Sequence, residues 1–309
     1  MKQIFGLALA IMFACIARAS DIHGTLGPRQ LAAGTVLLFQ PRSLIGWKSA
    51  DFKLNREGMI AFSADDQLEL ESCLPAGTLQ LTDTNVAKQD IAWKGGRFVL
   101  KAKDISLKGA IQTIDFTPSG TEPIFNGKDL KGWSVFDDEK RKKSKFEVTK
   151  DGELHVTDGP GDLQTDGKYA DFLLQLEVKT NAEGLNSGVF FRCIDKQYQN
   201  GYELQIQNSI LDGDATKPKD FGTGAIYRRR AAARVVSKDK EWTHITLIAH
   251  GDTFASWVNG EPVLSWKDDR KKDENPRKGL RLEAGHISLQ GHDPTTDVLF
   301  RNIKIVELK

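Results

Sequence analysis

Apolar and polar residues alternate with a period of two along much of the chain, which is typical of strands that bury one face. The clearest run is residues 202–207. Its apolar positions are Tyr202, Leu204 and Ile206, and its polar positions are Glu203, Gln205 and Gln207. Long helical periodicity is scarce, so the pattern predicts an all-β protein.

The strand-like segments fall into two regions. Residues 117–122 (TPSGTE) carry no apolar pattern and predict a linker. We expect a small β-rich domain at 20–116 and a larger domain at 123–309. In the larger domain, Asn259-Gly260 has the composition of a two-residue hairpin turn. Because many short strands follow one another without strand–helix–strand alternation, we expect a jelly-roll β-sandwich there.

A short repeat links the two regions. Residues 38–47 match 124–133 in the spacing of their apolar pair, glycine and tryptophan. Each copy is followed by a strand–turn–strand pattern, at 52–62 and 146–156. Either both regions merely share hairpin architecture, or the N-terminal region is a shortened relative of the second domain.

The first 19 residues have the features of a secretory signal peptide, namely Lys2, a short apolar run and small residues up to Ala19. The run is too short for a good membrane-spanning helix. A lipoprotein anchored at Cys15 is the less favoured alternative, because residues 12–14 match a lipid-attachment box poorly. We therefore predict a secreted or periplasmic protein without a membrane span.

Composition narrows the possible partners. The 309 residues include 43 Lys+Arg and 42 Asp+Glu, so no net field favours nucleic acid or an anionic membrane. Beyond the signal peptide, Cys73 and Cys193 remain. They form one disulfide if paired, or are two small buried side chains, and both alternatives stay open.

Charged residues mark three neighbouring segments of the second domain. Residues 172–179 alternate as 202–207 do, and Arg192 lies on the face of its strand opposite the apolar one. If these strands form an antiparallel meander, Glu177, Arg192 and Glu203 fall in one lateral row. Such a row is either a site or a surface ladder of ion pairs.

A set of motifs in this domain resembles a known family. In order, they are IFNGKDLKGW, DLQTDGKYADFLLQLEVK, NSGVFFR, YELQIQN, GAIY, VNGEPV, HISLQGH and FRNIKI. Over about 122–309 they resemble the 3-keto-disaccharide hydrolases. The resemblance implies a concanavalin A-like sandwich, export from the cell, and cleavage of glycosides whose sugar is oxidised to a ketone at carbon 3. The chain departs from the family pattern at Lys179, Asn208 and Asp293, where Arg, Asp and Gly are usual.

The chemistry implied by the resemblance differs from ordinary glycoside hydrolysis, which uses two carboxyl groups flanking the bond. Laminarinase-type enzymes on this fold carry them as Glu-x-Asp-x-(x)-Glu, but residues 203–208 are Glu-Leu-Gln-Ile-Gln-Asn. A ketone at carbon 3 acidifies the hydrogen on carbon 2. A single base can then start elimination of the glycosidic oxygen, after which water adds back.

The candidate residues follow from this chemistry. We predict Glu203 or Glu177 as the base, Arg192 as the group that stabilises charge on the ketone oxygen, and His292 as an acid or base. Predicted substrate-binding residues are Asn186, Gln205, Tyr227, Gln290 and His155. No short ligand spacing supports a metal site, and we expect neither metal nor cofactor.

Several of these candidate residues also have a purely structural interpretation. Tyr227 is either a sugar platform or a core aromatic, and His292 is either functional or a hydrogen-bonded residue at a strand end. The basic runs at 140–143 and 267–278 are expected to be solvated loops. The arginines at 228–230 either form a solvated loop too, which is favoured, or overhang the groove and bind an acidic sugar. The alternative functions are a non-catalytic carbohydrate-binding module and a structural or adhesion module. The expected partner is a carbohydrate.

Overall fold

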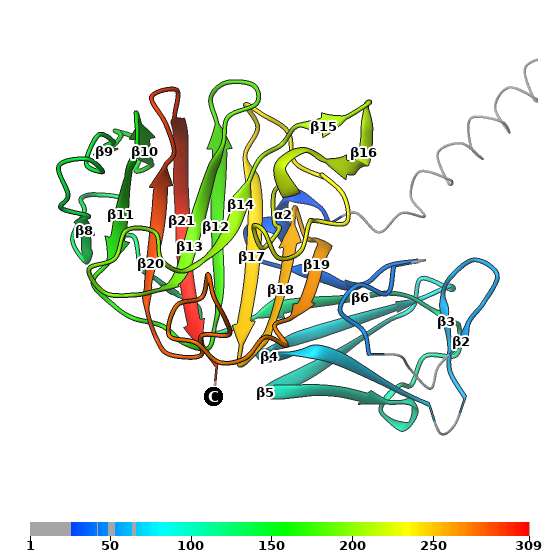
Figure 1. Ribbon diagram of the computed structural model, residues 1–309. Coiled ribbons are helices and arrows are strands. Elements are labelled where there is room, and N and C mark those ends of the chain that lie inside the picture. Colours follow the sequence, from blue (N-terminus) through cyan, green and yellow to red (C-terminus); the bar gives the residue numbers. More distant parts are fainter. Residues whose placement is uncertain (1–25, 42, 49–52, 64–65, 309) are drawn as a thin grey trace, which may run out of the picture.

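The computed structural model describes residues 26–41, 43–48, 53–63 and 66–308. Within them the protein is all-β as predicted, with one five-residue α-helix, α2 (Pro28–Ala32), and two short 3₁₀ turns. Two sheets face each other in the C-terminal part, and a third sheet is built from the N-terminal part (Figure 1). The predicted signal peptide at 1–19 and its Cys15 lie outside the described residues.

The sandwich consists of an eight-stranded and a five-stranded sheet. The larger sheet has the order β19 (Glu261–Lys267), β18 (Thr253–Val258), β17 (Thr243–His250), β12 (Phe172–Thr180), β21 (Asp297–Glu307), β10 (Leu154–Thr157) and β9 (Lys145–Val148), with β7 (Glu122–Pro123) paired to β21. The smaller sheet has the order β14 (Tyr202–Ile206), β13 (Ser187–Cys193), β20 (His286–Gly291), β11 (Gly161–Thr165) and β8 (Trp133–Val135). A separate hairpin joins β15 (Ile210–Leu211) to β16 (Asp214–Pro218).

Alternation places the core between these two sheets. Tyr202, Leu204 and Ile206 pack in it together with Val189 and Phe191 of the neighbouring strand β13. The polar residues of β14 therefore face away from the core, as the sequence pattern predicts. One face of the five-stranded sheet is left to carry polar chemistry.

The predicted three-strand meander is wrong. β13 and β14 pair with each other, but β12 pairs with β17 and β21 in the opposite sheet. The chain crosses from one sheet to the other between Thr180 and Ser187. Glu177 therefore lies in a different sheet from Arg192 and Glu203, and the expected row does not form.

The N-terminal part forms a six-stranded sheet on the outer face of the larger sandwich sheet. Its order is β2 (Lys53–Leu54), β3 (Ile60–Ala61), β6 (Ile111–Pro118), β4 (Gln67–Asp83) and β5 (Lys88–Lys101), with β1 (Val36–Phe39) paired to β6. Its hydrophobic core includes Leu173, Ile248, Ala255 and Trp257 of the sandwich. The indole of Trp257 donates a hydrogen bond to the carbonyl of Leu37 at 2.9 Å. The strands β12, β17 and β18 are thus buried on both faces where the N-terminal sheet covers them.

The short sequence repeat is also a structural repeat. The indole of Trp47 donates to the carbonyl of Leu38 at 2.8 Å, and the indole of Trp133 donates to the carbonyl of Ile124 at 2.7 Å. The glycine before each tryptophan has a positive φ, 87° in the first copy and 85° in the second. The two copies share a local fold as well as spacing, which supports the interpretation of a shortened relative.

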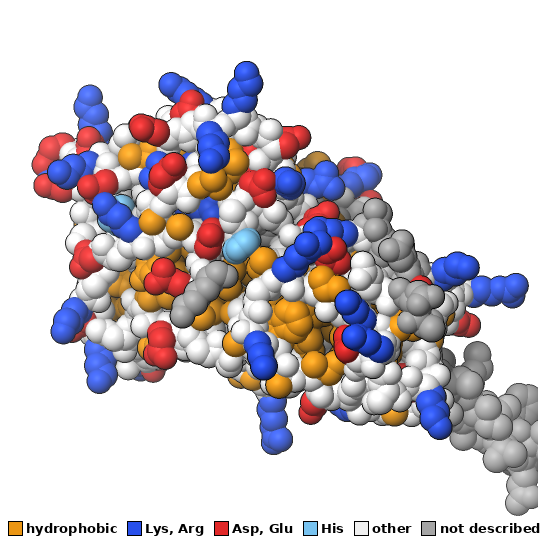
Figure 2. Space-filling view, turned by 90° about the horizontal axis from the view of Figure 1, so that it is seen from below, with side chains coloured by type: hydrophobic (Ala, Val, Ile, Leu, Met, Phe, Trp, Pro, Cys, Tyr) orange, Lys and Arg blue, Asp and Glu red, His pale blue; other side chains and the backbone are white. Residues whose placement is uncertain are grey.

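The cysteines, the charge distribution and the helix lengths bear on three predictions made from the sequence. Cys73 and Cys193 are both free thiols, so the disulfide alternative is excluded. Basic and acidic side chains are interspersed over the face shown in Figure 2, in keeping with the formal net charge of +1. Among the described residues, no helix has the length and apolar character needed to cross a membrane.

Candidate functional site

A cavity of about 420 Å³ lies on the polar face of the five-stranded sheet, above β13 and β14. The predicted site residues that line it are Asn186, Glu203, Gln205, Tyr227, Gln290 and His292. The other lining residues are Phe190, Gln199, Gly201, Tyr202, Arg228, Arg229, Pro276 and Arg277. The cavity is of the size that holds a small sugar ligand.

Strand register explains how these side chains meet. Glu203 pairs with Phe190 and Gln205 pairs with Gly188 across the β14–β13 ladder. The outer edge of β14 is covered by residues 223–227, because the backbone N–H of Tyr227 donates to the carbonyl of Glu203 at 2.9 Å. This pairing fixes Tyr227, which is half-buried, at the rim of the cavity.

Glu203 is the carboxyl group of the cavity wall. Burial, and then the negative charge of Asp220, raise its pKa to about 8, while the guanidinium groups of Arg277 and Arg228 act in the opposite direction. No hydrogen bond contributes to that shift among the described residues. A carboxyl with a pKa this close to neutrality is suited to take up a proton during a reaction.

Gly188 makes room for that carboxyl. A Cβ atom at position 188 would lie 2.8 Å from Oε1 of Glu203. The carboxylate therefore lies directly over the neighbouring strand, where only glycine leaves the space.

Three side-chain amides surround Glu203 in fixed orientations. Oδ2 of Asp220 accepts hydrogen bonds from Nδ2 of Asn186 at 3.0 Å and from Nε2 of Gln205 at 3.1 Å. Nε2 of Gln290 donates to Oε1 of Gln199 at 3.3 Å. The amide oxygens of Asn186, Gln205 and Gln290 are buried and have no partner among the described residues. Acceptors of this kind match the hydroxyl donors of a sugar.

His292 is held by Asp293, one of the three residues at which the chain departs from the family pattern. Nδ1 of His292 lies 2.8 Å from Oδ2 of Asp293. Hydrogen bonds from Thr295, and then from His292, keep the pKa of Asp293 below its ordinary value although burial opposes this. The contact with Nδ1 leaves Nε2 of His292 to act as a donor or acceptor in the cavity it lines.

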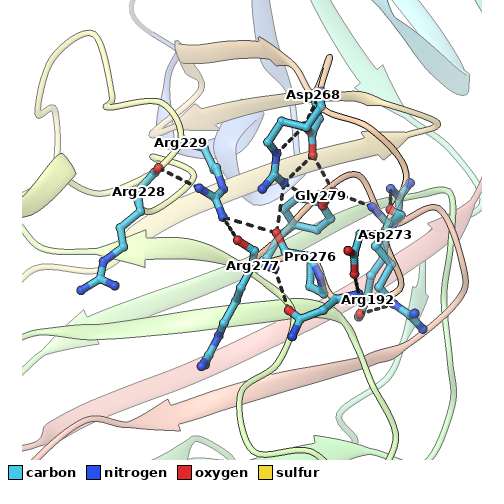
Figure 3. Close-up of polar contacts among 12 residues, drawn as sticks. Arg192, Arg228, Arg229, Asp268, Asp273, Pro276, Arg277 and Gly279 are labelled. Carbon is cyan, nitrogen blue, oxygen red and sulfur yellow. Dashed lines mark hydrogen bonds and ion pairs between the residues drawn. The ribbon is translucent and has the colours of Figure 1, made fainter.

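Arginines form the rim. Nη2 of Arg229 donates to the carbonyl of Arg277 at 2.8 Å and to that of Pro276 at 3.4 Å, which joins two loops (Figure 3). The side chains of Arg228 and Arg277 extend to the same side of this junction in Figure 3. The basic runs at 228–230 and 267–278 are therefore not merely solvated loops, because both contribute to the cavity wall.

Arg192 is not in the cavity, contrary to our prediction. It is 0% exposed. Its guanidinium donates to the carbonyls of Ala170, Gly251 and Arg281 and to the carboxylate of Asp171, each at 2.8–2.9 Å. The register of β13 shifts after Phe190, and Arg192 has a φ of 51°. This β-bulge overrides the simple alternation and makes Arg192 a structural residue.

Glu177 and His155 lie on the outer face of the larger sheet, away from the cavity. Glu177 accepts hydrogen bonds from Arg301 at 2.9 Å and from Asn302 at 2.6 Å. Burial would raise the pKa of Glu177, but these hydrogen bonds lower it. His155 is paired with Asp297 at 2.7 Å. Both predicted site residues are instead members of polar contacts between strands.

Sequence reasoning missed Gln199, Asp220 and Arg277, which come from loops without periodic pattern. The sole signal was the basic run at 267–278, which contains Arg277. Asn208, another departure from the family pattern, donates to Asp239 at 2.8 Å and does not line the cavity.

Among the described residues, no cluster of three or more His, Cys, Asp or Glu side chains is arranged to hold a metal.

Comparisons with known proteins agree with this architecture. A crystal structure from Parabacteroides distasonis, described as a "putative glycosyl hydrolase", matches with a TM-score of 0.50 and 24% identity over 62% of this chain and 94% of that one. A second such structure from the same organism matches with a TM-score of 0.46 and 28% identity over 62% of this chain and 86% of that one. No curated protein shows significant sequence similarity. The family model for 3-keto-alpha-glucoside-1,2-lyase-like domains matches residues 120–306, so the chain belongs to this family.

Proposed function

We propose that this protein cleaves glycosides of 3-keto sugars by base-initiated elimination followed by hydration. The observation that carries the proposal is Glu203, a single carboxyl with a pKa near 8 in a sugar-sized cavity. Around it lie buried amides with unpartnered oxygens. Family membership supports the same chemistry, because its description names a lyase acting on 3-keto-glucosides.

In this mechanism the carboxylate of Glu203 removes the proton from carbon 2, which the neighbouring ketone acidifies. The electron pair forms the enolate and then expels the glycosidic oxygen from carbon 1, leaving a carbon–carbon double bond. Nε2 of His292, with Nδ1 held by Asp293, donates a proton to the departing oxygen. Water then adds at carbon 1 and gives a proton to Nε2 of His292, while Glu203 returns a proton, which has exchanged with solvent, to carbon 2. Each proton transfer of this type contributes about 10²–10⁴-fold to the rate.

A mechanism with two carboxylates fits the site poorly. Among the described lining residues, Glu203 is the one carboxylic acid. The carboxyl group of Asp220 is near enough to raise the pKa of Glu203, but its Oδ2 is engaged by Nδ2 of Asn186 and Nε2 of Gln205 and it does not line the cavity. On the same sheet face, Asp162 is fully buried and bonded to Ser288 and Gln164. It lies on β11, three strands from β14, or roughly 14 Å away at the usual strand spacing. The two-carboxylate mechanisms need about 5–9.5 Å between the groups.

The loop between β13 and β14 limits the length of the substrate. Its residue Gln199 accepts a hydrogen bond from Nε2 of Gln290 on β20 at 3.3 Å, so the loop crosses from β14 over the polar face. Tyr198 of the same loop packs edge-on against Phe136 at 5.5 Å between ring centroids. This barrier closes one end of the cavity, which favours a disaccharide or a short glycoside over a polysaccharide.

The direct test uses 3-keto-trehalose and trehalose as a matched pair in D₂O. We expect glucose release from 3-keto-trehalose alone, with deuterium at carbon 2 of the 3-keto product because elimination exchanges that hydrogen with solvent. Cleavage of trehalose at a similar rate, or release without deuterium at carbon 2, would contradict the mechanism. Binding of either sugar without cleavage would identify a carbohydrate-binding module instead.

Replacement of Gly188 by alanine is expected to lower kcat by about 10²-fold, because the new Cβ displaces the carboxylate of Glu203 from its place over the sheet. The group that must move is the end of a flexible side chain, so the free energy of unfolding should change by less than about 1 kcal/mol. Steady-state kinetics and urea unfolding measure the two effects. Gly27→Ala is the control, since its Cβ would meet no atom closer than 3.8 Å. Unchanged kcat in Gly188→Ala would show that the position of Glu203 is not critical.

A further inference from the structure

The arginines at the mouth of the cavity have no acidic partner. In the described part of the chain, the arginines that form ion pairs are Arg97, Arg192, Arg234, Arg270, Arg281 and Arg301. Arg228, Arg229 and Arg277 are absent from these pairs although all three line the cavity. Neighbouring cations without an ion-pair contact repel one another. Burial lowers the pKa of Arg229, and the charge of Arg228 helps to lower it further. A bound anion would offset that repulsion.

The three arginines are not equivalent. The guanidinium of Arg229 is half-buried and bonded to the carbonyls of the opposite loop, so its role is to hold that loop. Arg228 and Arg277 are exposed. Nη2 of Arg277 donates to the carbonyl of Gln199 at 2.9 Å, and the guanidinium of Arg228 lies 5.3 Å from the ring centre of Tyr227. Each retains several N–H groups for a ligand.

The positions of these two arginines are set by the backbone. Arg228 occupies the tip of a tight turn with a φ of 57°, closed by hydrogen bonds from the N–H groups of Arg229 and Arg230 to the carbonyl of Ile226. Arg277 lies in the loop that Arg229 holds (Figure 3). Both are close enough to lower the pKa of Glu203 through their charge. The two cations therefore converge on the reacting carboxyl from separate loops.

A sugar that reacts with Glu203 must lie against the floor of the cavity, where the carboxylate lies over Gly188. The part of the glycoside that leaves then extends toward the exposed rim. We propose that Arg228 and Arg277 form an anion-binding subsite at this rim, which selects glycosides that carry a carboxylate on the leaving part. The planar guanidinium matches a carboxylate in shape and charge. This inference rests on the proposed function for the placement of the sugar.

Binding of two unreactive ligands tests the subsite without any need for catalysis. The ligands are 4-carboxyphenyl glucoside and its neutral amide counterpart, 4-carbamoylphenyl glucoside, which both keep the hydroxyl at carbon 3. By calorimetry at low salt, we expect the carboxylate ligand to bind about tenfold more tightly. The preference should shrink as NaCl is raised, because the rim is exposed to solvent.

Variants assign the preference to the two arginines. Arg228→Gln and Arg277→Gln should each reduce it several-fold, and the double variant should abolish it. Arg230→Gln is the matched control, because Arg230 is exposed on the same loop but does not line the cavity. Equal affinities for the two ligands, no binding of either, or a preference that survives in the double variant would overturn the proposal. Failure to cleave 3-keto sugars would instead refute the proposed function and leave the binding result intact.

Discussion

Replacement of Glu203 by glutamine is expected to lower kcat for a 3-keto-glucoside by about 10²–10⁴-fold, which is the usual contribution of a positioned base. Glutamine keeps the size and the hydrogen-bonding capacity of the side chain but cannot accept the proton from carbon 2. Because the amides of Asn186, Gln205 and Gln290 still bind the sugar in the proposed complex, KM should change little. Steady-state kinetics on a 3-keto-glucoside, with coupled detection of released glucose, measures both constants.

The same variant should alter the dependence of the rate on pH. The wild-type base must be ionised, and its pKa is about 8. With a 3-keto-glucoside whose leaving group departs without protonation, such as 4-nitrophenolate, His292 is not needed as an acid. For this substrate kcat/KM should therefore rise tenfold per pH unit up to about pH 8 and level off above it. Glu203→Gln should lose this dependence in its residual activity. A wild-type profile that is flat between pH 6 and 9 would remove Glu203 as the base.

Stability should move in the opposite direction to activity. Folding raises the pKa of Glu203 from 4.5 to about 8, so the folded state binds the proton more tightly than the unfolded state. Stability is therefore lost as pH rises through that window, where the buried carboxyl must ionise. Above pH 8, Glu203→Gln should melt at the same temperature as the wild type or higher. Glu183→Gln, at an exposed position, is the control and should change neither activity nor melting.

Replacement of Arg192 by methionine is expected to lower the free energy of unfolding by about 3–5 kcal/mol, because each of the three carbonyls that loses its donor costs about 1–3 kcal/mol. The guanidinium is 0% exposed and satisfies three carbonyls as well as Asp171. Methionine fills the volume but removes the donor from each of the three carbonyls, whereas Asp171 still accepts from the N–H of Gly251. Urea unfolding monitored by tryptophan fluorescence measures the loss.

Two further variants interpret that result. Arg192→Lys keeps the charge but not the fork of donors, so it should recover only part of the stability. Arg230→Met, at an exposed position, should stay within about 0.5 kcal/mol of the wild type. If Arg192→Met folds with native stability and loses turnover, Arg192 is a catalytic residue after all and the structural interpretation fails.

Much of the fold follows from local sequence pattern. Period-two alternation correctly identified β12 and β14 as strands and the two faces of β14. The Asn259-Gly260 turn joins β18 to β19 with φ values of 50° and 79°, as a two-residue hairpin of this composition requires. Glu203, Gln205 and Gln290 were placed on the polar face by the same argument, and they line one cavity.

The rest of the site could not be read from the sequence. Alternation gives the face of a residue within its strand, but not the sheet that the strand joins, and Glu177 was misplaced for this reason. A β-bulge moved Arg192 out of the expected row. Arg277 and Gln199 reach the cavity from loops whose backbone follows no period.

The sequence by itself thus determined the class of fold, the family and the polar face on which chemistry is possible. The tertiary structure alone decided which charged residues gather at that face. The physical reason is range: alternation and turn composition act between residues a few positions apart, whereas strand pairing, bulges and loop closure depend on contacts between distant segments. Those distant contacts bring the charge of Asp220 and the arginines of two loops to Glu203.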